Sequence, residues 1–335
     1  MCTCISFGKE NHYFGRNLDL ETPFGEQILL TPRQYPLEVP NQPTLSTHYA
    51  MIGMASAAGP YPFYAEAANE KGLCMAGLNF PQNAYYVSPG EGKGRGIASY
   101  ALIAFVLGQC ATLSEAKALL ETIFITNQSY APDLPAAPLH WMIADQTGAL
   151  VLEQQADGLH LYENPIGVLT NNPPFPFQME HLRQYLHLTP KTVTNTFAKA
   201  LSLTPFGQGF GAIGLPGDWS PASRFVKTVF LLQNSLWGQT EAEIVTQAFH
   251  VLDQVSMVRG SVLTAEGKAD QTLYSCLFNA TKGIYYYTTY ENRQISTISL
   301  WDGALDSQEL QWVPLQRTPQ FFSQSFSYPS AMVEG

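Results

Sequence analysis

Cys2 is the residue of this chain with the most direct potential for chemistry, because only Met1 precedes it. Cysteine is small, so we expect Met1 to be removed, which leaves a thiol and a free α-amine on one residue. An α-amine has an ordinary pKa of about 7.7–8.0, so part of it is neutral near pH 7 and can accept a proton. Since a nucleophile beside a built-in base favours acyl transfer, position 2 predicts a hydrolase.

Arg16 and Asp19 stand three residues apart near the end of an otherwise apolar stretch. A cationic side chain near a thiol favours the thiolate, so Arg16 is a candidate for activating Cys2. The Asp19 carboxylate is a candidate for orienting the α-ammonium of Cys2 through a hydrogen bond. The structural alternative for each residue is a surface charge or a charge paired for stability.

Asn79, Asn171 and Arg224 complete the set of candidate catalytic residues. Each asparagine follows an apolar run that ends in a loop, where it is either a turn former or an amide donor directed at an oxyanion. Arg224 follows Pro221 and Ser223 at the start of a predicted helix. Its guanidinium belongs either to the capping turn or to the cysteine site.

Three competing kinds of site have weaker support. A cysteine–histidine dyad needs an oriented histidine, and His140 is the best candidate, but no papain-like or caspase-like string surrounds any cysteine. The G-x-S-x-G string of serine hydrolases is absent. Cys2 and Cys4 have no partner pair at zinc-like spacing, so we expect no metal. We interpret Cys4 as a small buried apolar residue.

Composition narrows the class of protein. The 335 residues are 45% hydrophobic and only 13% charged, which is typical of a large core or an oligomer with buried faces. The net charge of −10, without a basic cluster, argues against nucleic acid as a partner. We expect a cytoplasmic protein without a membrane span, because the chain has neither an 18-residue apolar run nor a basic–apolar leader. Five scattered cysteines fit a reducing compartment.

Periodicity predicts strands and helices in separate blocks. The predicted strands are 3–7, 12–17, 27–31, 49–56, 73–80, 139–145, 149–155, 159–162, 167–170, 272–278, 283–290 and 294–300. The predicted helices are 97–110, 112–123 with a capping box from Thr112 to Glu115, 178–186, 222–233 and 241–254. Residues 61–66 and 131–138 are predicted as loops. This order favours an α+β fold of antiparallel sheets with helices outside them. We expect one domain over residues 2–335, with a weakly patterned tail from about 316.

Several short strings occur in a specific order behind Met1-Cys2-Thr3. They are Phe14-Gly15-Arg16-Asn17-Leu18-Asp19, Asn69-Glu70-Lys71-Gly72-Leu73, Gly77-Leu78-Asn79-Phe80-Pro81, Gly167-Val168-Leu169-Thr170-Asn171-Asn172-Pro173, Gly214-Leu215-Pro216-Gly217-Asp218 and Pro221-Ala222-Ser223-Arg224-Phe225. As an ordered set, they resemble the choloylglycine hydrolase family of bile salt hydrolases and penicillin V acylases. The resemblance extends from Cys2 to about Tyr290.

The resemblance implies a four-layer αββα N-terminal nucleophile fold, no metal or organic cofactor, and usually a homotetramer. It implies that Cys2 is the nucleophile. It places Arg16, Asp19, Asn171 and Arg224 on the other active-site positions of the family, and Asn79 on the position that supplies an oxyanion contact in the branch that hydrolyses bile salts. Penicillin-cleaving members tend to have tyrosine at that last position.

The resemblance therefore predicts an amidase acting on glycine- or taurine-conjugated bile salts. Such a substrate needs an apolar pocket, which we expect to be lined by Phe24, Tyr61, Phe63, Tyr64, Phe80 and Leu134, with the 61–66 loop shaping substrate choice. Two alternatives remain open. One is a penicillin V acylase or another acyl-amide hydrolase, for example one acting on acyl-homoserine lactones. The other is a non-enzymatic protein that binds amphipathic acyl ligands.

Overall fold

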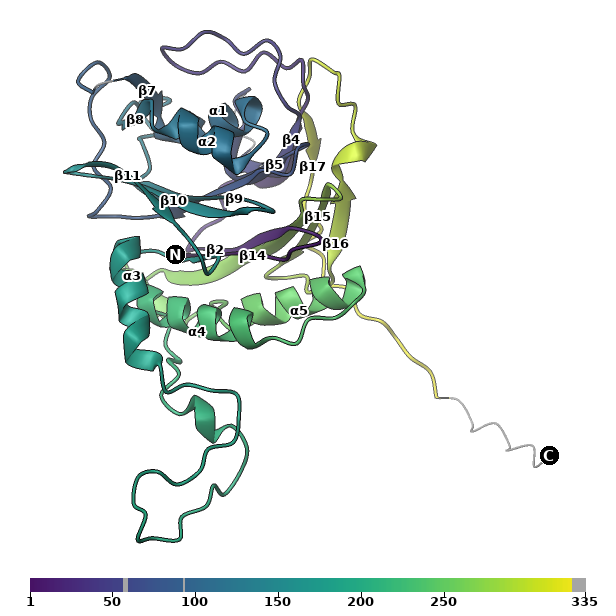
Figure 1. Cartoon of the computed structure of the whole chain (residues 1–335). Helices are drawn as coiled ribbons and strands as arrows, with labels where there is room; N and C mark the ends of the chain where they lie inside the picture. The colour runs from purple at the N-terminus through teal and green to yellow at the C-terminus, as the bar shows by residue number, and fades with distance from the viewer. Residues whose placement is uncertain (57–59, 93, 327–335) are drawn as a thin grey trace.

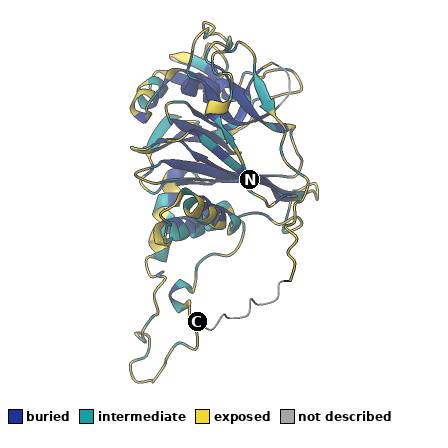
Figure 2. Ribbon diagram, turned by 90° about the vertical axis from the view of Figure 1, so that its right-hand side faces the viewer, coloured by how far each residue is buried: buried dark blue, intermediate teal, exposed yellow. Residues whose placement is uncertain are grey.

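Two antiparallel sheets packed face to face form the centre of the molecule, with helices on both outer faces (Figure 1). The structure is a computed structural model that describes residues 1–56, 60–92 and 94–326. The expected four-layer αββα arrangement is confirmed. Both sheets are largely buried, as Figure 2 shows.

The first sheet, sheet A, combines strands from the N-terminal and the C-terminal parts of the chain. Its strand order is β12-β1-β2-β14-β15-β16, and β13 pairs with β14. The strands are β1 (Cys2–Phe7), β2 (Tyr13–Leu20), β12 (Val168–Leu169), β13 (Val262–Leu263), β14 (Ala269–Asn279), β15 (Ile284–Thr289) and β16 (Ser296–Ser299). The β1–β2 hairpin predicted around residues 8–11 is confirmed, and it places Cys2 opposite Leu18.

The second sheet, sheet B, has the strand order β11-β10-β9-β6-β5-β4-β3-β17. Its strands are β3 (Glu26–Thr31), β4 (Met51–Ser56), β5 (Phe63–Asn69), β6 (Cys74–Asn79), β9 (Leu139–Asp145), β10 (Gly148–Gln155), β11 (Gly158–Glu163) and β17 (Gln311–Val313). A separate parallel pair consists of β7 (Arg95–Ala98) and β8 (Ile123–Thr126).

Each helical layer covers one sheet. Sheet B carries α1 (Leu102–Gln109) and α2 (Leu113–Leu120), and sheet A carries α3 (Phe175–His181), α4 (Pro221–Asn234) and α5 (Glu241–Asp253). Short 3₁₀ turns lie at Ser99–Ala101, Leu182–Tyr185, Phe210–Ala212 and Leu300–Asp302. No helix in the described part of the chain is both long enough and apolar enough to cross a membrane.

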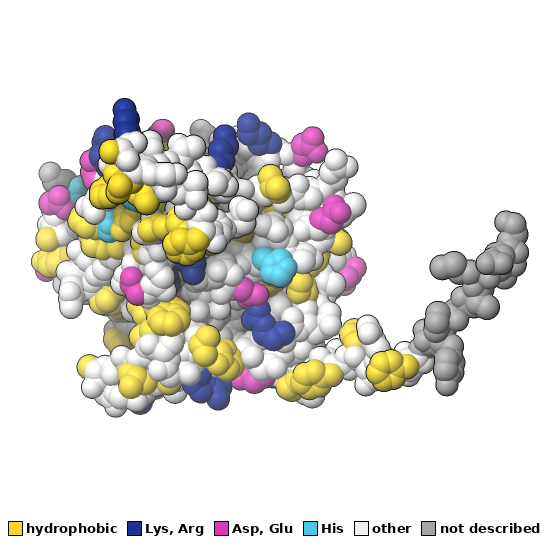
Figure 3. All heavy atoms as spheres, turned by 90° about the horizontal axis from the view of Figure 1, so that it is seen from below, with side chains coloured by type: hydrophobic (Ala, Val, Ile, Leu, Met, Phe, Trp, Pro, Cys, Tyr) yellow, Lys and Arg dark blue, Asp and Glu magenta, His cyan; other side chains and the backbone are white. Residues whose placement is uncertain are grey.

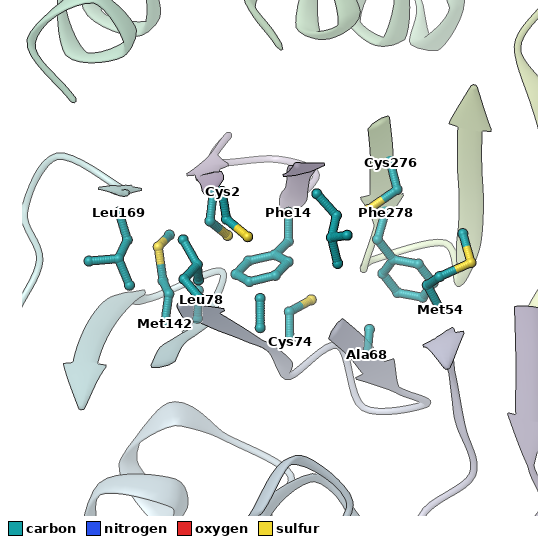
Figure 4. Packing of buried hydrophobic residues seen from close by; sticks show 14 of the residues in the cluster. Cys2, Phe14, Met54, Ala68, Cys74, Leu78, Met142, Leu169, Cys276 and Phe278 are labelled. Carbon is teal, nitrogen blue, oxygen red and sulfur yellow. The ribbon is translucent and has the colours of Figure 1, made fainter. Parts of the chain in front are cut away.

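Three apolar clusters hold the layers together. The largest lies between the sheets, where Phe14 and Phe278 of sheet A meet Cys74 and Leu78 of sheet B (Figure 4). A second cluster joins sheet B to α1 and α2, and a third joins sheet A to α5. The site residues on β1 and β2 therefore lie on a rigid, doubly covered support.

The prediction of a loop over residues 61–66 is wrong, because most of it belongs to strand β5. Its sequence, Phe-Tyr-Ala-Glu-Ala-Ala-Asn, is rich in alanine and contains a buried glutamate, so it lacks the usual strand pattern. Pairing with β4 and β6 on both sides overrides that weak preference.

The helix predicted over 97–110 begins later than expected. Ile97 and Ala98 belong to β7, a 3₁₀ turn follows, and α1 starts at Leu102. The periodicity of an apolar run that is buried on all sides does not distinguish a strand from a helix. The sequence therefore does not indicate where α1 begins. In the predicted tail, no regular structure follows β17 in residues 314–326, and the rest of the tail lies outside the described residues.

Candidate active site

Cys2 opens strand β1 at the edge of the inter-sheet core, with 5% of its surface exposed. Its backbone is held on both sides. The Cys2 N–H donates to Oδ1 of Asn171 over 2.8 Å, and the Cys2 carbonyl accepts a hydrogen bond from Nη1 of Arg224. These contacts fix the nitrogen and the carbonyl of the nucleophile candidate.

Asn171 lies two residues after β12, at the point where this edge strand ends beside β1. Its Oδ1 accepts from both the Cys2 N–H and Nη2 of Arg224, each at 2.8 Å, and its Nδ2 donates to the Asn79 carbonyl over 2.7 Å. One amide side chain thus links three of the predicted site residues.

Arg224 lies in the first turn of α4, which begins after Ser220, whose hydroxyl accepts from the Ser223 N–H. Only 1% of Arg224 is exposed. Besides its contacts to Cys2 and Asn171, it donates to the Thr3 hydroxyl over 2.7 Å. Burial lowers the pKa of Arg224, and the charge of Asp19 opposes that shift. The guanidinium therefore contacts the backbone of the cysteine site and is more than part of a capping turn.

Arg16 lies on β2 and is fully buried. Its Nη1 donates to the carbonyls of Ala65 and Gly77 over 2.9 and 2.8 Å, whereas Nε and Nη2 have no hydrogen-bond partner in the described part of the chain. Burial alone lowers the pKa of Arg16, but its charge interactions, first with Cys2 and then with Tyr274, outweigh burial and raise it. Arg16 is thus a permanent cation next to the thiol.

Asp19 is also fully buried, three residues further along β2. Its Oδ1 accepts from the Thr272 hydroxyl over 2.5 Å, and its Oδ2 has no hydrogen-bond partner among the described residues. Burial raises the pKa of Asp19, while the N-terminal amine and Arg224 oppose this shift. A buried carboxylate oxygen without a donor is costly unless a donor arrives in the working state of the protein.

Met1 precedes strand β1 and exchanges backbone hydrogen bonds with Asp19 on β2. The Met1 amine donates to the Asp19 carbonyl over 2.5 Å and lies 3.4 Å from Oδ2 of Asp270, and the Met1 carbonyl accepts from the Asp19 N–H over 2.8 Å. Met1 is not among the residues that line the cavity beside Cys2.

A cavity of about 520 Å³ opens beside Cys2. Its walls are mostly apolar, and Arg16 is the charged side chain among the lining residues, which also include Asn79. Four of the six predicted pocket residues, Phe24, Phe63, Tyr64 and Leu134, line this cavity. Its volume lies within the range of sites that enclose small amphipathic molecules.

Tyr61 and Phe80 do not line the cavity, which corrects the prediction for these two residues. Phe80 is fully buried and stacks on His140 with ring centroids 4.2 Å apart. Tyr61 packs against the rings of Phe63 and Tyr100, and it lines a separate surface cavity that does not include Cys2. Tyr64, in contrast, does line the cavity.

Several lining residues were missed, among them Leu18, Leu20, Tyr100, Pro135, Ala137 and Leu139. Leu18 and Leu20 follow Arg16 at intervals of two, and alternate residues of a strand share one face. That spacing in the sequence indicates that Leu18 and Leu20 lie on the same face of the strand as Arg16. Tyr100 stands in the short turn before α1, whose position depends on tertiary packing, so the sequence offered no signal for it.

His140 is not part of a cysteine–histidine dyad, so that alternative is wrong. The imidazole is fully buried, with Nε2 at 2.8 Å from the Thr170 carbonyl and Nδ1 at 3.1 Å from Oε1 of Glu153. Both ring nitrogens are therefore engaged with groups other than the Cys2 thiol.

Known proteins with similar sequences cover nearly the whole chain. A family model described as linear amide C–N hydrolases, choloylglycine hydrolase family, matches residues 2–312. The chain is 41% identical over 323 residues to a bile salt hydrolase/transferase of Lactiplantibacillus plantarum, covering 96% of this chain and 99% of that protein. It is 39% identical to a protein of the same name from Clostridium perfringens, covering 95% and 98%.

Solved structures support the same relationship. A mutant of conjugated bile acid hydrolase from Clostridium perfringens matches with a TM-score of 0.90 at 37% identity, covering 97% of this chain and 100% of that one. Penicillin V acylase from Agrobacterium tumefaciens matches with a TM-score of 0.75 at 18% identity, covering 95% and 92%, and therefore shares the fold. On the extent of these matches, the chain belongs to the choloylglycine hydrolase family of linear amide C–N hydrolases.

Proposed function

We propose that this protein hydrolyses the amide bond of glycine- or taurine-conjugated bile salts, with Cys2 as the nucleophile. The observation that carries the proposal is the position of Cys2 on the wall of a mostly apolar cavity of about 520 Å³, with its backbone held by Asn171 and Arg224. Such a cavity suits a rigid apolar acyl group. The names of the relatives, at 39–41% identity, point to the same substrates.

The proposed reaction begins with removal of Met1, which frees the α-amine of Cys2. The amine keeps Oδ1 of Asn171 as one acceptor, and Oδ2 of Asp19, which has no donor among the described residues, is available as another. The amine takes the thiol proton as the sulfur attacks the amide carbonyl carbon. Arg16 favours the thiolate that forms, because it is a buried cation on the same cavity wall.

The attack produces a tetrahedral oxyanion. We assign its stabilisation to the side-chain amide of Asn79, which lies at the end of β6 and lines the cavity. Asn171 has its Oδ1 and one Nδ2 hydrogen already engaged, so we assign it to positioning. The ammonium then protonates the leaving glycine or taurine nitrogen as the C–N bond breaks, and an acyl-thioester remains on Cys2.

Water completes the cycle. The α-amine accepts a proton from water as the oxygen attacks the thioester, and the Cys2 sulfur leaves and recovers that proton. The products are a free bile acid and a regenerated thiol, and no cofactor enters any step. A penicillin or another acyl amide would follow the same sequence, so chemistry alone does not separate these substrates.

We further propose that the protein works in the cytoplasm as a homotetramer. The segment between α3 and α4 extends away from the body of the molecule (Figure 1) and carries nearly fully exposed phenylalanines, Phe197 at 93% and Phe206 at 96%. Apolar side chains are also scattered over the face formed by α3–α5 (Figure 3). Exposed apolar groups of this size favour burial against another copy.

The test compares kcat/KM of the purified protein for glycocholate, taurocholate and penicillin V. We expect a clear preference for the bile salts, and loss of at least 10³-fold in kcat for Cys2→Ala, because the reaction loses its nucleophile. Cys4→Ala is the matched control, since burial raises the pKa of the Cys4 thiol and keeps it unreactive.

A kcat of Cys2→Ala equal to that of wild type would contradict the proposed mechanism. A higher kcat/KM for penicillin V would leave the mechanism intact and replace the substrate. Intact mass of the active protein checks the processing step, and we expect a mass without Met1. Trapping an acyl-thioester on Cys2 excludes the purely ligand-binding alternative.

A further inference from the structure

Glu66 is a fully buried carboxylate that the mechanism above does not use. It lies on β5 of sheet B, is 2% exposed, and points across the interface to sheet A. Its Oε2 accepts from the Tyr274 hydroxyl and its Oε1 from the Tyr285 hydroxyl, both over 2.7 Å. The thiol of Cys276 lies 3.5 Å from Oε1. These donors come from two neighbouring strands of the opposite sheet.

The charged partner of Glu66 is Arg16. Nη1 of Arg16 lies 3.5 Å from Oε2 of Glu66, in addition to its shorter bonds to the carbonyls of Ala65 and Gly77. All three acceptors lie on sheet B, so they hold one corner of the guanidinium there. The remaining Nε and Nη2 donors have no partner in the described part of the chain, and the same side chain lines the cavity with Cys2.

The hydrogen-bond geometry around Glu66 suits its ionised form. The titratable and charged groups that face it are Arg16 from β2, Tyr274 and Cys276 from β14, Tyr285 from β15 and Cys4 from β1. Burial raises the pKa of Glu66, and Arg16 and the hydroxyl donors offset only part of that rise. Because both oxygens face donors, the geometry matches a carboxylate that only accepts hydrogen bonds.

We propose that Glu66 is a positioning residue that limits how strongly Arg16 activates Cys2. Its negative charge offsets part of the guanidinium field at the sulfur. The inference rests on the proposed function, because it assumes that Cys2 is the nucleophile. It adds that the field at the sulfur is set by a buried pair reaching from β5 to β2, and not by Arg16 alone.

The experiment measures the pH dependence of iodoacetamide alkylation of Cys2 in the processed full-length protein, without substrate. Tandem mass spectrometry assigns the adduct to Cys2 and distinguishes it from Cys4. We expect Glu66→Gln to lower the pH midpoint of alkylation by roughly one pH unit, since removing a nearby negative charge stabilises the thiolate. Glu66→Asp keeps the charge and should restore a midpoint near that of wild type.

Glu153→Gln is the matched control, because Glu153 is an equally buried carboxylate that pairs with His140 and makes no contact with Arg16. Its midpoint should match wild type even if its melting temperature falls. If Glu66→Gln does not fold, Arg16→Gln is compared with Arg16→Gln/Glu66→Gln, and the double variant should have the lower midpoint.

An unchanged or raised midpoint in folded Glu66→Gln, or equal midpoints in the second comparison, would overturn the inference while leaving the hydrolase function standing. Absence of any alkylation of wild-type Cys2 would instead overturn the nucleophile assignment and this inference with it. The two failures are therefore distinguishable.

Discussion

At the scale of single residues, the site is held by groups that use most of their hydrogen-bonding capacity on the protein itself. Asn171 contacts Cys2, Arg224 and Asn79, and Arg224 contacts the backbone of Cys2. Among the described residues, the Nε and Nη2 donors of Arg16 and the Oδ2 acceptor of Asp19 have no hydrogen-bond partner. These free donors and acceptors are the parts of the site available to thiolate, ammonium or substrate.

The first prediction concerns Asp19. In the processed enzyme, Asp19→Asn should fold normally but lower kcat about 10- to 100-fold. The reason is that an amide of the same shape lacks the charge that orients the α-ammonium, and such a charged hydrogen bond contributes about 1.5–3 kcal/mol. Steady-state kinetics and a thermal melt check this together.

Asp270→Asn is the control for that prediction, since Asp270 carries a nearby carboxylate whose ammonium partner in the described structure is Met1. We expect a much smaller loss there. A normally melting Asp19→Asn protein with wild-type kcat would mean that another carboxylate orients the amine.

At the scale of secondary-structure elements, the β1–β2 hairpin positions Cys2, Arg16 and Asp19 together. His12 lies at the far end of this hairpin and is 3% exposed. Its Nε2 is 2.9 Å from the Ser6 hydroxyl oxygen. Burial lowers the pKa of His12 to about 4, well below the 6.5 of an ordinary histidine. The hairpin therefore contains a histidine that is neutral at neutral pH.

This histidine makes the stability of the fold depend on pH. Between pH 6.5 and 4 the unfolded chain binds a proton at His12 that the folded chain does not, so the free energy of unfolding falls as the pH falls through this window. The lowered pKa of His12 reduces the free energy of unfolding at pH 4 by roughly 3 kcal/mol relative to its value at neutral pH. Urea unfolding should show that His12→Gln loses less stability than wild type between pH 7 and pH 4.

His250→Gln removes an exposed histidine from α5 and serves as the comparison. Its pH slope should follow that of wild type. Parallel slopes for wild type and His12→Gln would mean that His12 titrates normally in the folded protein.

The elements themselves were predictable where local signals agreed with tertiary context. Helix α5 was expected over 241–254 and runs from Glu241 to Asp253, because Thr240 and Glu243 form a capping box at its start. Strand β5 was not predictable, since Ala65, Glu66 and Ala67 resemble a helix and only pairing on both sides makes them a strand. Short strands such as β13 and β17 exist only through their partners.

The candidate site was predictable in a similar way. The six catalytic candidates could be chosen from ordered strings. In the structure, hydrogen bonds link Cys2, Asn171, Arg224 and the backbone of Asn79, and Arg16 lines the same cavity as Cys2. The pocket residues were less accessible, because Tyr61 and Phe80 are large apolar residues in suitable segments that nevertheless face other rings. The side of a segment that an aromatic ring faces depends on packing from distant parts of the chain. The sequence does not encode that packing locally.

At the scale of the whole molecule, the projecting segment between α3 and α4 distinguishes this chain from a self-contained sandwich. Besides Phe197 and Phe206, it exposes Leu201, Leu203 and Ile213. Burying a phenylalanine side chain contributes about 3 kcal/mol at most to association. Removing two of them should therefore weaken association by roughly 10²- to 10⁴-fold.

We therefore expect Phe197→Ser/Phe206→Ser to elute as smaller species than wild type in size-exclusion chromatography with light scattering. Phe321→Ser/Phe322→Ser changes two equally exposed phenylalanines beyond β17 and should leave the assembly unchanged. Identical molar masses for wild type and the Phe197/Phe206 variant would argue against this segment as the contact between copies.

The long-range bonding of Cys2 has a consequence for biosynthesis. The amide that receives its N–H lies 169 residues later in the chain, and the guanidinium that binds its carbonyl lies 222 residues later. Sheet A closes around β2 only when β14, from Ala269 to Asn279, arrives. A chain synthesised from its N-terminus therefore presents Cys2 first, and Cys2 reaches its final surroundings only after the later elements are in place. The contacts that hold Cys2 therefore cannot form until the segments containing Asn171 and Arg224 have been synthesised.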